Sequence, residues 1–216
     1  MASGAPDLRA ARGYGIGFAV LFTLALTVLL GELVGAFADD AESFPPYFDT
    51  APERLRHALG AYLLVGSGLA FLAFTVRATA GADDDSATAT DARTARLAAA
   101  VFAALVGLAS AALATVSLSV GFGQVTGDPG IREAQELLPQ LGYVVLMVPA
   151  ALSAALAVWL VARLGARTAT MPEWVAASGY VVAAAQLLSF YSLPLALLPL
   201  WVLTASLAPR RLSARS

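Results

Sequence analysis

The stretch WVAASGYVVAAAQLLSFYSLPLALLPLWVLTASLA, residues 174–208, contains no charged side chain. As a single α-helix it would be about 52 Å long, whereas the hydrocarbon core of a bilayer is about 30 Å thick. Pro194 interrupts it, because proline has no backbone N–H and disfavours helical geometry at the residue before it. The stretch therefore predicts two membrane helices, over residues 174–190 and 193–208, with a tight turn near Tyr191–Pro194.

The composition of the whole chain agrees with a bilayer as its solvent. Its 216 residues are 59% hydrophobic and 13% charged, with a mean hydropathy of +0.75. A soluble domain carries roughly 25% charged residues, so this chain has too little polar surface to cover a soluble globule. The net charge of −2 gives no reason to expect nucleic acid as a partner. We expect a lipid bilayer, and leave open a homo-oligomer or another membrane protein.

Four more apolar runs precede this stretch, and each is long enough, or nearly so, to cross a membrane. Together with the last two they predict an all-α fold, a polytopic transmembrane helical bundle of about six spans in one transmembrane domain. The expected spans are residues 13–38, 58–77, 97–122, 141–163, 174–190 and 193–208.

The distribution of basic residues predicts the orientation of the bundle. Cytoplasmic flanks of membrane helices are enriched in Lys and Arg. With the N-terminus inside, ten of the thirteen basic residues fall on the cytoplasmic side, and only Arg54, Arg56 and Arg132 fall outside. Both termini are therefore expected to be cytoplasmic, in a multi-pass protein of the plasma membrane.

Two connectors have distinct compositions. Residues 39–57 form the predicted outer loop. Residues 81–94, which begin GADDDSATATDAR, are acidic, small and polar, so we expect a flexible cytoplasmic loop. Asp128 before Pro129 predicts the start of a short helix on the membrane surface.

Two similar tetrapeptides, TAPE (50–53) and TMPE (170–173), match the capping-box pattern that starts helices. They open the second and fifth spans, which would be equivalent in a 3+3 inverted repeat, a common transporter plan. Because helix starts favour these residues in general, the repeat is kept only as an alternative.

Glu32 is an acid within the apolar run that ends in GELVGAFADD, residues 31–40. One reading is an intramembrane polar or ion site. The other is a position at the outer rim, near the headgroups or paired with a basic neighbour. Gly31 and Gly35 form a G-x-x-x-G pattern, which predicts close helix packing beside it. The candidate partners at the outer rim are Arg54, Arg56 and His57.

The first run also has features of a signal peptide. Arg9 and Arg12 precede it, and residues 36–38 have the A-x-A form of a cleavage site. However, the apolar part from Gly15 to Leu30 already exceeds the usual length of about 7–15 residues. We expect residues 1–38 to be retained as the first span, with cleavage as the alternative.

Two further patterns lie inside the predicted spans. Small residues recur at every fourth position of the third span, which predicts a helix-packing face. The stripe comprises Ala99, Ala103, Gly107, Ala111, Thr115, Ser119 and Gly123, and its first four members are the predicted packing residues. Gln186 is the most polar residue of the last two spans, and is either an interhelical hydrogen-bonding group or part of an intramembrane polar site. In a transporter it would line a cavity with groups such as Ser178, Tyr180 and Thr115.

Familiar catalytic and cofactor signatures are absent from the sequence. There is no cysteine and only one histidine, His57, which argues against thiolate chemistry, a zinc site and a bis-histidine haem. No Walker loop, H-E-x-x-H or G-x-S-x-G motif occurs. We therefore expect no enzyme activity, cofactor or bound metal.

The long outer loop after the first span, MPEW (171–174) and LPLWVLTASLA (198–208) resemble a large family of uncharacterised six-helix prokaryotic membrane proteins. The resemblance implies the fold and no activity. The sequence favours a structural, regulatory or assembly component that acts through helix–helix contacts. A small transporter or channel is the alternative.

Overall fold

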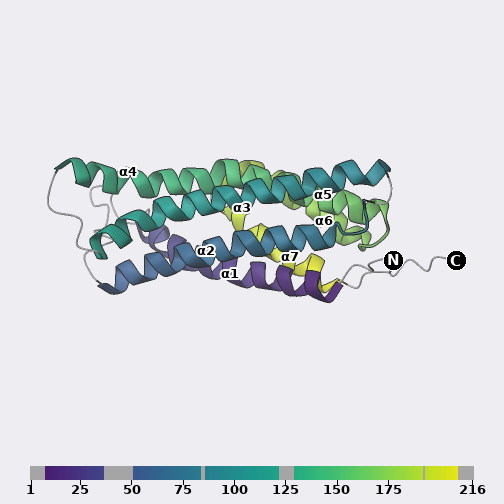
Figure 1. Cartoon of the computed structure of the whole chain (residues 1–216), viewed down its shortest axis with the longest axis horizontal. Coiled ribbons are helices and arrows are strands. Elements are labelled where there is room, and N and C mark those ends of the chain that lie inside the picture. The colour runs from purple at the N-terminus through teal and green to yellow at the C-terminus, as the bar shows by residue number, and fades with distance from the viewer. Residues whose placement is uncertain (1–7, 37–50, 84–85, 122–128, 192, 209–216) are drawn as a thin grey trace.

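The computed structural model describes residues 8–36, 51–83, 86–121, 129–191 and 193–208, and within them it contains only helices and their connecting turns. Figure 1 shows these helices running side by side along one long axis. In chain order they are α1 (Leu8–Ala36), α2 (Ala51–Ala78), α3 (Ser86–Gly121), α4 (Pro129–Val145), the π-helix η1 (Leu146–Ala150), α5 (Ala151–Arg167), α6 (Glu173–Ala185), the 3-10 helices η2 (Gln186–Tyr191) and η3 (Leu193–Ala196), and α7 (Leu197–Leu207).

Four helical stretches are long and apolar enough to cross a membrane: Arg9–Leu29, Arg54–Ala78, Ser86–Thr115 and Leu137–Arg167. The prediction of an all-helical fold is confirmed for the described residues. Helices α6 and α7 have 13 and 11 residues. At 1.5 Å per residue they are about 20 and 17 Å long, so neither α-helix alone crosses a 30 Å core.

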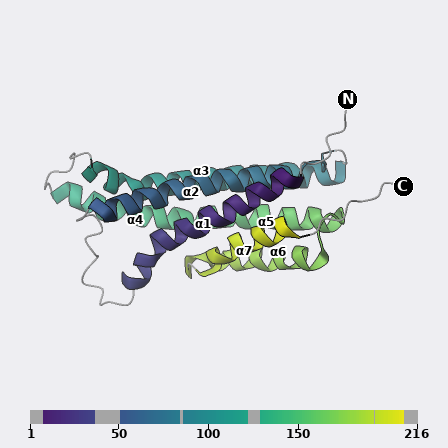
Figure 2. The same ribbon diagram turned by 90° about the horizontal axis from the view of Figure 1, so that it is seen from below.

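The last four elements form an antiparallel hairpin, hereafter the broken hairpin (α6, η2, η3 and α7). Figure 2 shows that it turns back part-way along the bundle, while α2, α3 and α4 extend beyond it. Helix α7 ends beside the start of α1, where Gly15 lies against the Ser206 side chain. The start of α1 and the end of α7 therefore lie at the same end of the bundle.

The interior between α1, α2 and α3 is filled by phenylalanine. Five buried rings pack there in stacked, tilted and edge-to-face pairs, with centroids 5.1 Å apart for Phe18 and Phe71 and 4.9 Å apart for Phe71 and Phe102. The other two are Phe22 and Phe74. Because a bilayer gives little hydrophobic drive between helices, this close packing of large rings is a main source of attraction among them.

The predicted small-residue face of α3 packs only at its start. Ala99 is buried and Ala103 partly buried, but Ala111 is exposed, and a Cβ on Gly107 would meet no atom within 4 Å. The prediction is wrong at these last two positions because each four-residue step rotates about 40° around a helix of 3.6 residues per turn. The face that packs contains instead Ala95, Ala98, Phe102, Val106, Ala109 and Leu113.

The predicted flexible loop over residues 81–94 is wrong from Ser86 onward, where α3 begins. Arg96 holds the preceding turn: its guanidinium donates to the Thr79 carbonyl at 2.9 Å and to Asp83 at 2.8 Å. Asp91 accepts from Arg167 at 3.1 Å, which ties α3 to α5. Alanine-rich sequence with paired charges favours helix over loop. Asp84 and Asp85 lie outside the described residues.

Helix α4 also differs from the prediction of a separate surface helix. It begins at Pro129 as expected, but continues through η1 into α5 as one long element. Tyr143 attaches it to α1 by donating a hydrogen bond to the Leu29 carbonyl at 3.0 Å. At TMPE, α6 begins one residue after Pro172, and the Thr170 hydroxyl bonds Thr168 rather than capping α6.

Candidate functional site at the tip of the broken hairpin

The regular helices stop where the broken hairpin turns. Helix α6 ends at Ala185, and the chain continues as the 3-10 helix η2 with a kink at Leu188, where φ is −104° and ψ is 18°. The return arm starts as η3 before α7 begins. Irregular backbone at membrane depth persists only where protein or a water-filled space surrounds it, so this tip is a candidate for function rather than a random distortion.

The tip packs against a second irregularity. Residues Leu146–Ala150 form a π-helix with Pro149 inside it, between α4 and α5. Such π-bulges occur often at functional sites. Ser189 of η2 donates its hydroxyl hydrogen to the Met147 carbonyl of this π-helix. Two interrupted helices therefore meet through a polar contact in an otherwise apolar region.

Gln186 lies at the start of η2 and is fully buried. Its Nε2 donates to the Pro194 carbonyl at 2.6 Å, across the turn from η2 to η3. This bond fixes the amide orientation, because two acceptor oxygens would repel at that distance. Its Oε1 is buried and has no hydrogen-bond partner among the described residues, which do not include Ser192 or the side chain of Tyr191 in the same turn. A buried acceptor without a donor costs about 1–3 kcal/mol.

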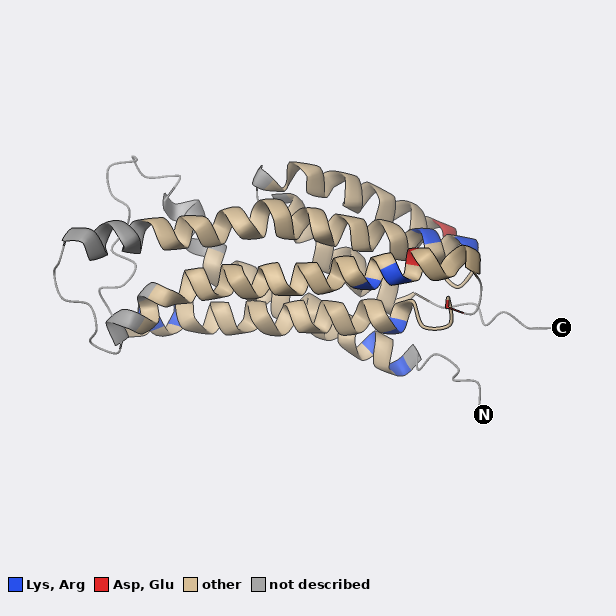
Figure 3. Ribbon diagram, turned by 45° about the horizontal axis from the view of Figure 1, so that its top comes forward, with Lys and Arg blue, Asp and Glu red and all other residues tan. Residues whose placement is uncertain are grey.

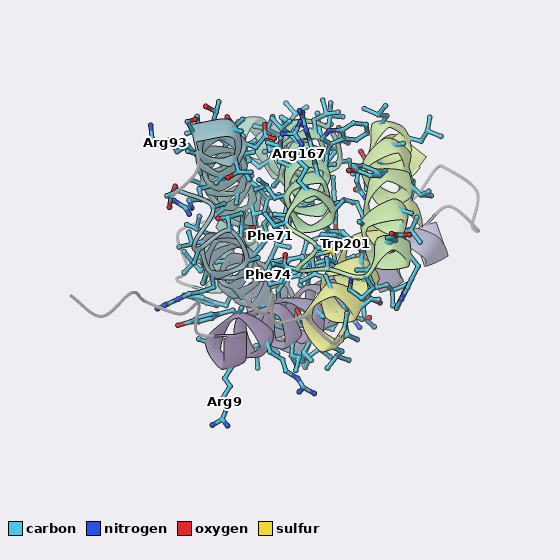
Figure 4. The ribbon with its side chains drawn as sticks, turned by 90° about the vertical axis from the view of Figure 1, so that its right-hand side faces the viewer. Arg9, Phe71, Phe74, Arg93, Arg167 and Trp201 are labelled. Carbon is cyan, nitrogen blue, oxygen red and sulfur yellow. The ribbon has the colours of Figure 1, made fainter. Side chains whose placement is uncertain are left out.

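The two arms below the tip are held together closely. Trp201 of α7 donates its indole N–H to the Val175 carbonyl of α6 at 3.0 Å. Gly179 allows this approach: a Cβ there would lie 2.8 Å from Ala162 Cβ and 2.9 Å from Trp201 Cε2. Figure 4 shows Trp201 pointing into the bundle, whereas Arg9 and Arg93 point away from it. The arms thus form a rigid support for the tip.

The tip lies far from the charged ends of the bundle. Figure 3 shows the described charged residues gathered at the two ends, with an uncharged zone between them. Met147, which Ser189 contacts, precedes Arg163 by 16 residues, so about 24 Å of helix separate them. The tip therefore lies within the uncharged zone of the bundle.

The other predicted site residues are not brought to this tip. Ser178 donates to the Val175 carbonyl of its own helix, and Tyr180 lies edge-to-face against Trp159 with centroids 4.8 Å apart. Thr115 is exposed and bonds the Ala111 carbonyl. The described side chains of these three therefore do not join Gln186 in the cavity that the transporter alternative would predict.

The outer-rim residues lie at the other end of α2. His57 is buried, Arg54 partly exposed and Arg56 exposed. Leu29 of α1 contacts Gly60 of α2, so one helical turn further out, position 32 of α1 lies level with His57. The side chain of Glu32, and the surroundings of Gly31 and Gly35, lie outside what the structure describes.

The opposite end carries most of the described charge. Asp91 binds both Arg163, at 3.3 Å, and Arg167, at 3.1 Å. Arg96 forms a bidentate ion pair with Asp83. These ion pairs are partly exposed, so we interpret them as contacts that hold the helix ends together and not as a catalytic or binding site.

Sequence analysis singled out Gln186 and did not predict the contact of Ser189 with the Met147 carbonyl. The prolines in FYSLPLALLP and MVPA were the available signal, since each removes a backbone donor. Comparison of the chain with protein-family models, with curated proteins and with solved structures finds no match.

Proposed function

We propose that this chain is a multi-pass protein of the plasma membrane with both termini cytoplasmic. Four long helices cross the bilayer, and the broken hairpin enters it from the cytoplasmic side and turns back, so that both of its ends lie on that side. The charge distribution supports this orientation. The described arginines at the end where α1 begins are Arg9, Arg12, Arg77, Arg93, Arg96, Arg163 and Arg167, against Arg54 and Arg56 at the other end. Positive charge favours the cytoplasmic side.

Within this frame, we propose that the protein binds and passes a small polar solute or ion at the tip of the broken hairpin. The observation that carries this proposal is the fully buried Gln186, whose Oε1 lacks a donor among the described residues. Interrupted helices that meet at membrane depth are the usual site of substrate and ion binding in transporters. The amide nitrogen of Gln186 holds the turn through the Pro194 carbonyl, whereas Oε1 is left for another partner in this proposal.

Purified protein in proteoliposomes tests the proposal. The assay measures tracer uptake of sodium and rubidium ions, and vesicle swelling in small polyols. Wild-type protein should give flux above empty vesicles, and Gln186→Leu should abolish it. Gln140→Leu is the matched control, because Gln140 is exposed on α4. Equal flux in both variants would show that the tip is not the transport site. Absence of wild-type flux for every probe would contradict a transport function.

A second candidate function is a structural, regulatory or assembly component. The observation that favours it is the interior between α1, α2 and α3, which is filled by Phe18, Phe71, Phe102 and their neighbours. The resemblance to six-helix membrane proteins of unknown activity stays a prediction and is compatible with either function. Stable co-purification with a single membrane partner, together with absent flux, would favour this candidate.

A further inference from the structure

The arginines at the end of the bundle where α1 begins fall into two groups. Arg96, Arg163 and Arg167 form ion pairs with Asp83 and Asp91. The others are exposed and form no ion pair with any described residue, and they are hereafter the arginine rim. The rim consists of Arg9 and Arg12 of α1, Arg77 of α2 and Arg93 of α3. Because a guanidinium group stays charged in proteins, the rim must face water or an external anion.

Arg12 and Arg77 lie at the same depth on two neighbouring helices. A Cβ on Gly15 of α1 would lie 3.0 Å from the Phe74 ring of α2, so these two positions are level. Arg12 is three residues from the first of them and Arg77 three residues from the second, each about 4.5 Å further toward the end of the bundle. The two arginines therefore belong to one layer across α1 and α2.

Arg93 of α3 lies in the same layer. A Cβ on Gly68 of α2 would lie 3.3 Å from the Cα of Ala103 on α3. Nine residues from this contact toward the end of the bundle are Arg77 on α2 and Thr94 on α3, next to Arg93. Because nine helical residues rise by about 14 Å on either helix, the rim follows one level around α1, α2 and α3. Figure 4 shows Arg9 and Arg93 pointing away from the bundle on different sides of it.

The rim lies directly outside the apolar surface of the bundle. Val76, which precedes Arg77, is exposed, and so is Leu97, one turn inside Arg93. On α1, the exposed ring of Tyr14 follows the first two arginines. Aromatic and basic residues mark the border between hydrocarbon and water in membrane proteins. In the membrane orientation proposed above, the rim is therefore level with the phospholipid phosphates.

The charge at this end favours an anion as the partner. The described residues there include the seven arginines named above and three acids, an excess of four positive charges. The acids are Asp83, Asp91 and Glu173. Residues 1–7, 84–85 and 209–216, which adjoin this end in the sequence, contain three more arginines and three aspartates, so the excess does not depend on them. Two of the three described acids are already ion-paired, which leaves the rim arginines for a partner outside the chain.

We propose that the arginine rim binds the headgroups of anionic phospholipids in the leaflet on this side of the membrane. The guanidinium groups donate to phosphate oxygens, a pairing that suits their planar donors. The partner is a lipid and not a free phosphate, because exposed apolar residues such as Val76 and Leu97 continue from the rim along the path of an acyl chain. This inference rests on the membrane position of the bundle and not on transport at the tip.

Native mass spectrometry of the full chain, mixed in detergent with equal amounts of phosphatidylglycerol and phosphatidylcholine, measures the ratio of the two bound lipids. Both lipids carry a phosphate, but only phosphatidylglycerol has a net negative charge. Wild-type protein should prefer phosphatidylglycerol by about fivefold or more, and Arg12→Gln/Arg77→Gln should lower this ratio by about threefold or more. The matched control Arg163→Gln/Arg167→Gln removes the same charge from ion-paired arginines at the same end and should keep the wild-type ratio.

The melting temperature in uncharged detergent separates lipid binding from a structural role of the rim. Because Arg12 and Arg77 form no ion pair with a described residue, their double variant should melt like wild type when no lipid is added. A lower melting temperature of this variant would show that the two arginines hold the fold. If the control does not fold without its ion pairs, the single substitutions Arg77→Gln and Arg167→Gln make the same comparison, since Arg163 then stays on Asp91.

Three results would overturn the inference. The first is equal binding of the two lipids by wild-type protein. The second is an equal fall of the ratio in the rim variant and the control, which would assign the preference to the net charge of this end. The third is displacement of phosphatidylglycerol by the same concentration of glycerol phosphate, which would indicate a site for soluble anions. None of these measurements depends on solute flux, so this proposal and the transport proposal fail in different ways.

Discussion

Gly179 gives the most specific prediction about the broken hairpin. It lies on α6 between α5 and α7, where a Cβ would be 2.8 Å from Ala162 Cβ and 2.9 Å from two ring atoms of Trp201. Ordinary carbon contacts are about 3.5–4.0 Å, so Gly179→Ala must push a helix away. The Trp201 ring cannot yield without disturbing its 3.0 Å hydrogen bond to the Val175 carbonyl.

The size of the effect follows from three contributions. Overpacking of a close helix contact costs about 1–3 kcal/mol. Loss of the indole hydrogen bond adds about 1 kcal/mol. The better helix propensity of alanine returns about 1 kcal/mol. We therefore expect Gly179→Ala to lower the free energy of unfolding by about 1–3 kcal/mol, or the melting temperature by about 2–12 °C.

Tryptophan fluorescence during heating in detergent measures this melting temperature. The matched control is Gly107→Ala, because a Cβ there meets no atom within 4 Å and the position is also inside a long helix. The control should be neutral or more stable by up to about 1 kcal/mol. If both substitutions shift the melting temperature alike, or if Gly179→Ala melts no lower than wild type, the close packing of α5, α6 and α7 is refuted.

Three further substitutions test other parts of the fold by the same melting assay. Ala169 follows α5 with a φ of 52°, where glycine is favoured, so Ala169→Gly should raise the free energy of unfolding by about 1 kcal/mol. A lower melting temperature of this variant would contradict the backbone conformation at residue 169. Asp91→Asn removes the anion shared by Arg163 and Arg167 and should lower the free energy of unfolding by about 1 kcal/mol or less. This decrease should be smaller in high salt, and a decrease that is the same in high and low salt would exclude ion pairing. Phe71→Ala leaves a cavity among buried rings and should cost on the order of 3 kcal/mol; a near-neutral result would contradict the packed interior.

Long apolar runs were enough to predict the long helices. A run such as residues 97–122 has no charge and forms the centre of α3. The hairpin turn near Tyr191–Pro194 followed from one proline, since its missing N–H is a local property. The earlier loss of regular helix at Gln186 was not predicted, because it depends on contacts with η1 and on the Pro194 carbonyl across the turn.

Features that depend on the neighbouring helix were harder to predict. Near the start of α3, Asp91 pairs with arginines of α5 that are more than seventy positions away in the sequence, which the local sequence does not reveal. The direction of the small-residue face drifts with helical twist, so Ala99 packs and Ala111 does not. Of the candidate site, the sequence identified Gln186 by its polarity. Its hydrogen bond to the Pro194 carbonyl depends on the three-dimensional turn and was not predicted.

The central claim is that hydrocarbon surrounds the middle of this bundle, with the connection between α5 and α6 inside the cell. The most direct test uses the absence of cysteine, which makes any introduced cysteine a unique label. Three exposed positions suit it: Ala51 at the start of α2, Leu69 in its middle and Ala169 between α5 and α6.

A membrane-impermeant maleimide is added to intact cells and then to permeabilised ones. We predict that Ala51→Cys reacts in intact cells, Ala169→Cys reacts only after permeabilisation, and Leu69→Cys reacts in neither. Labelling of Leu69→Cys by the water-soluble reagent, or of Ala169→Cys from outside intact cells, would contradict the account.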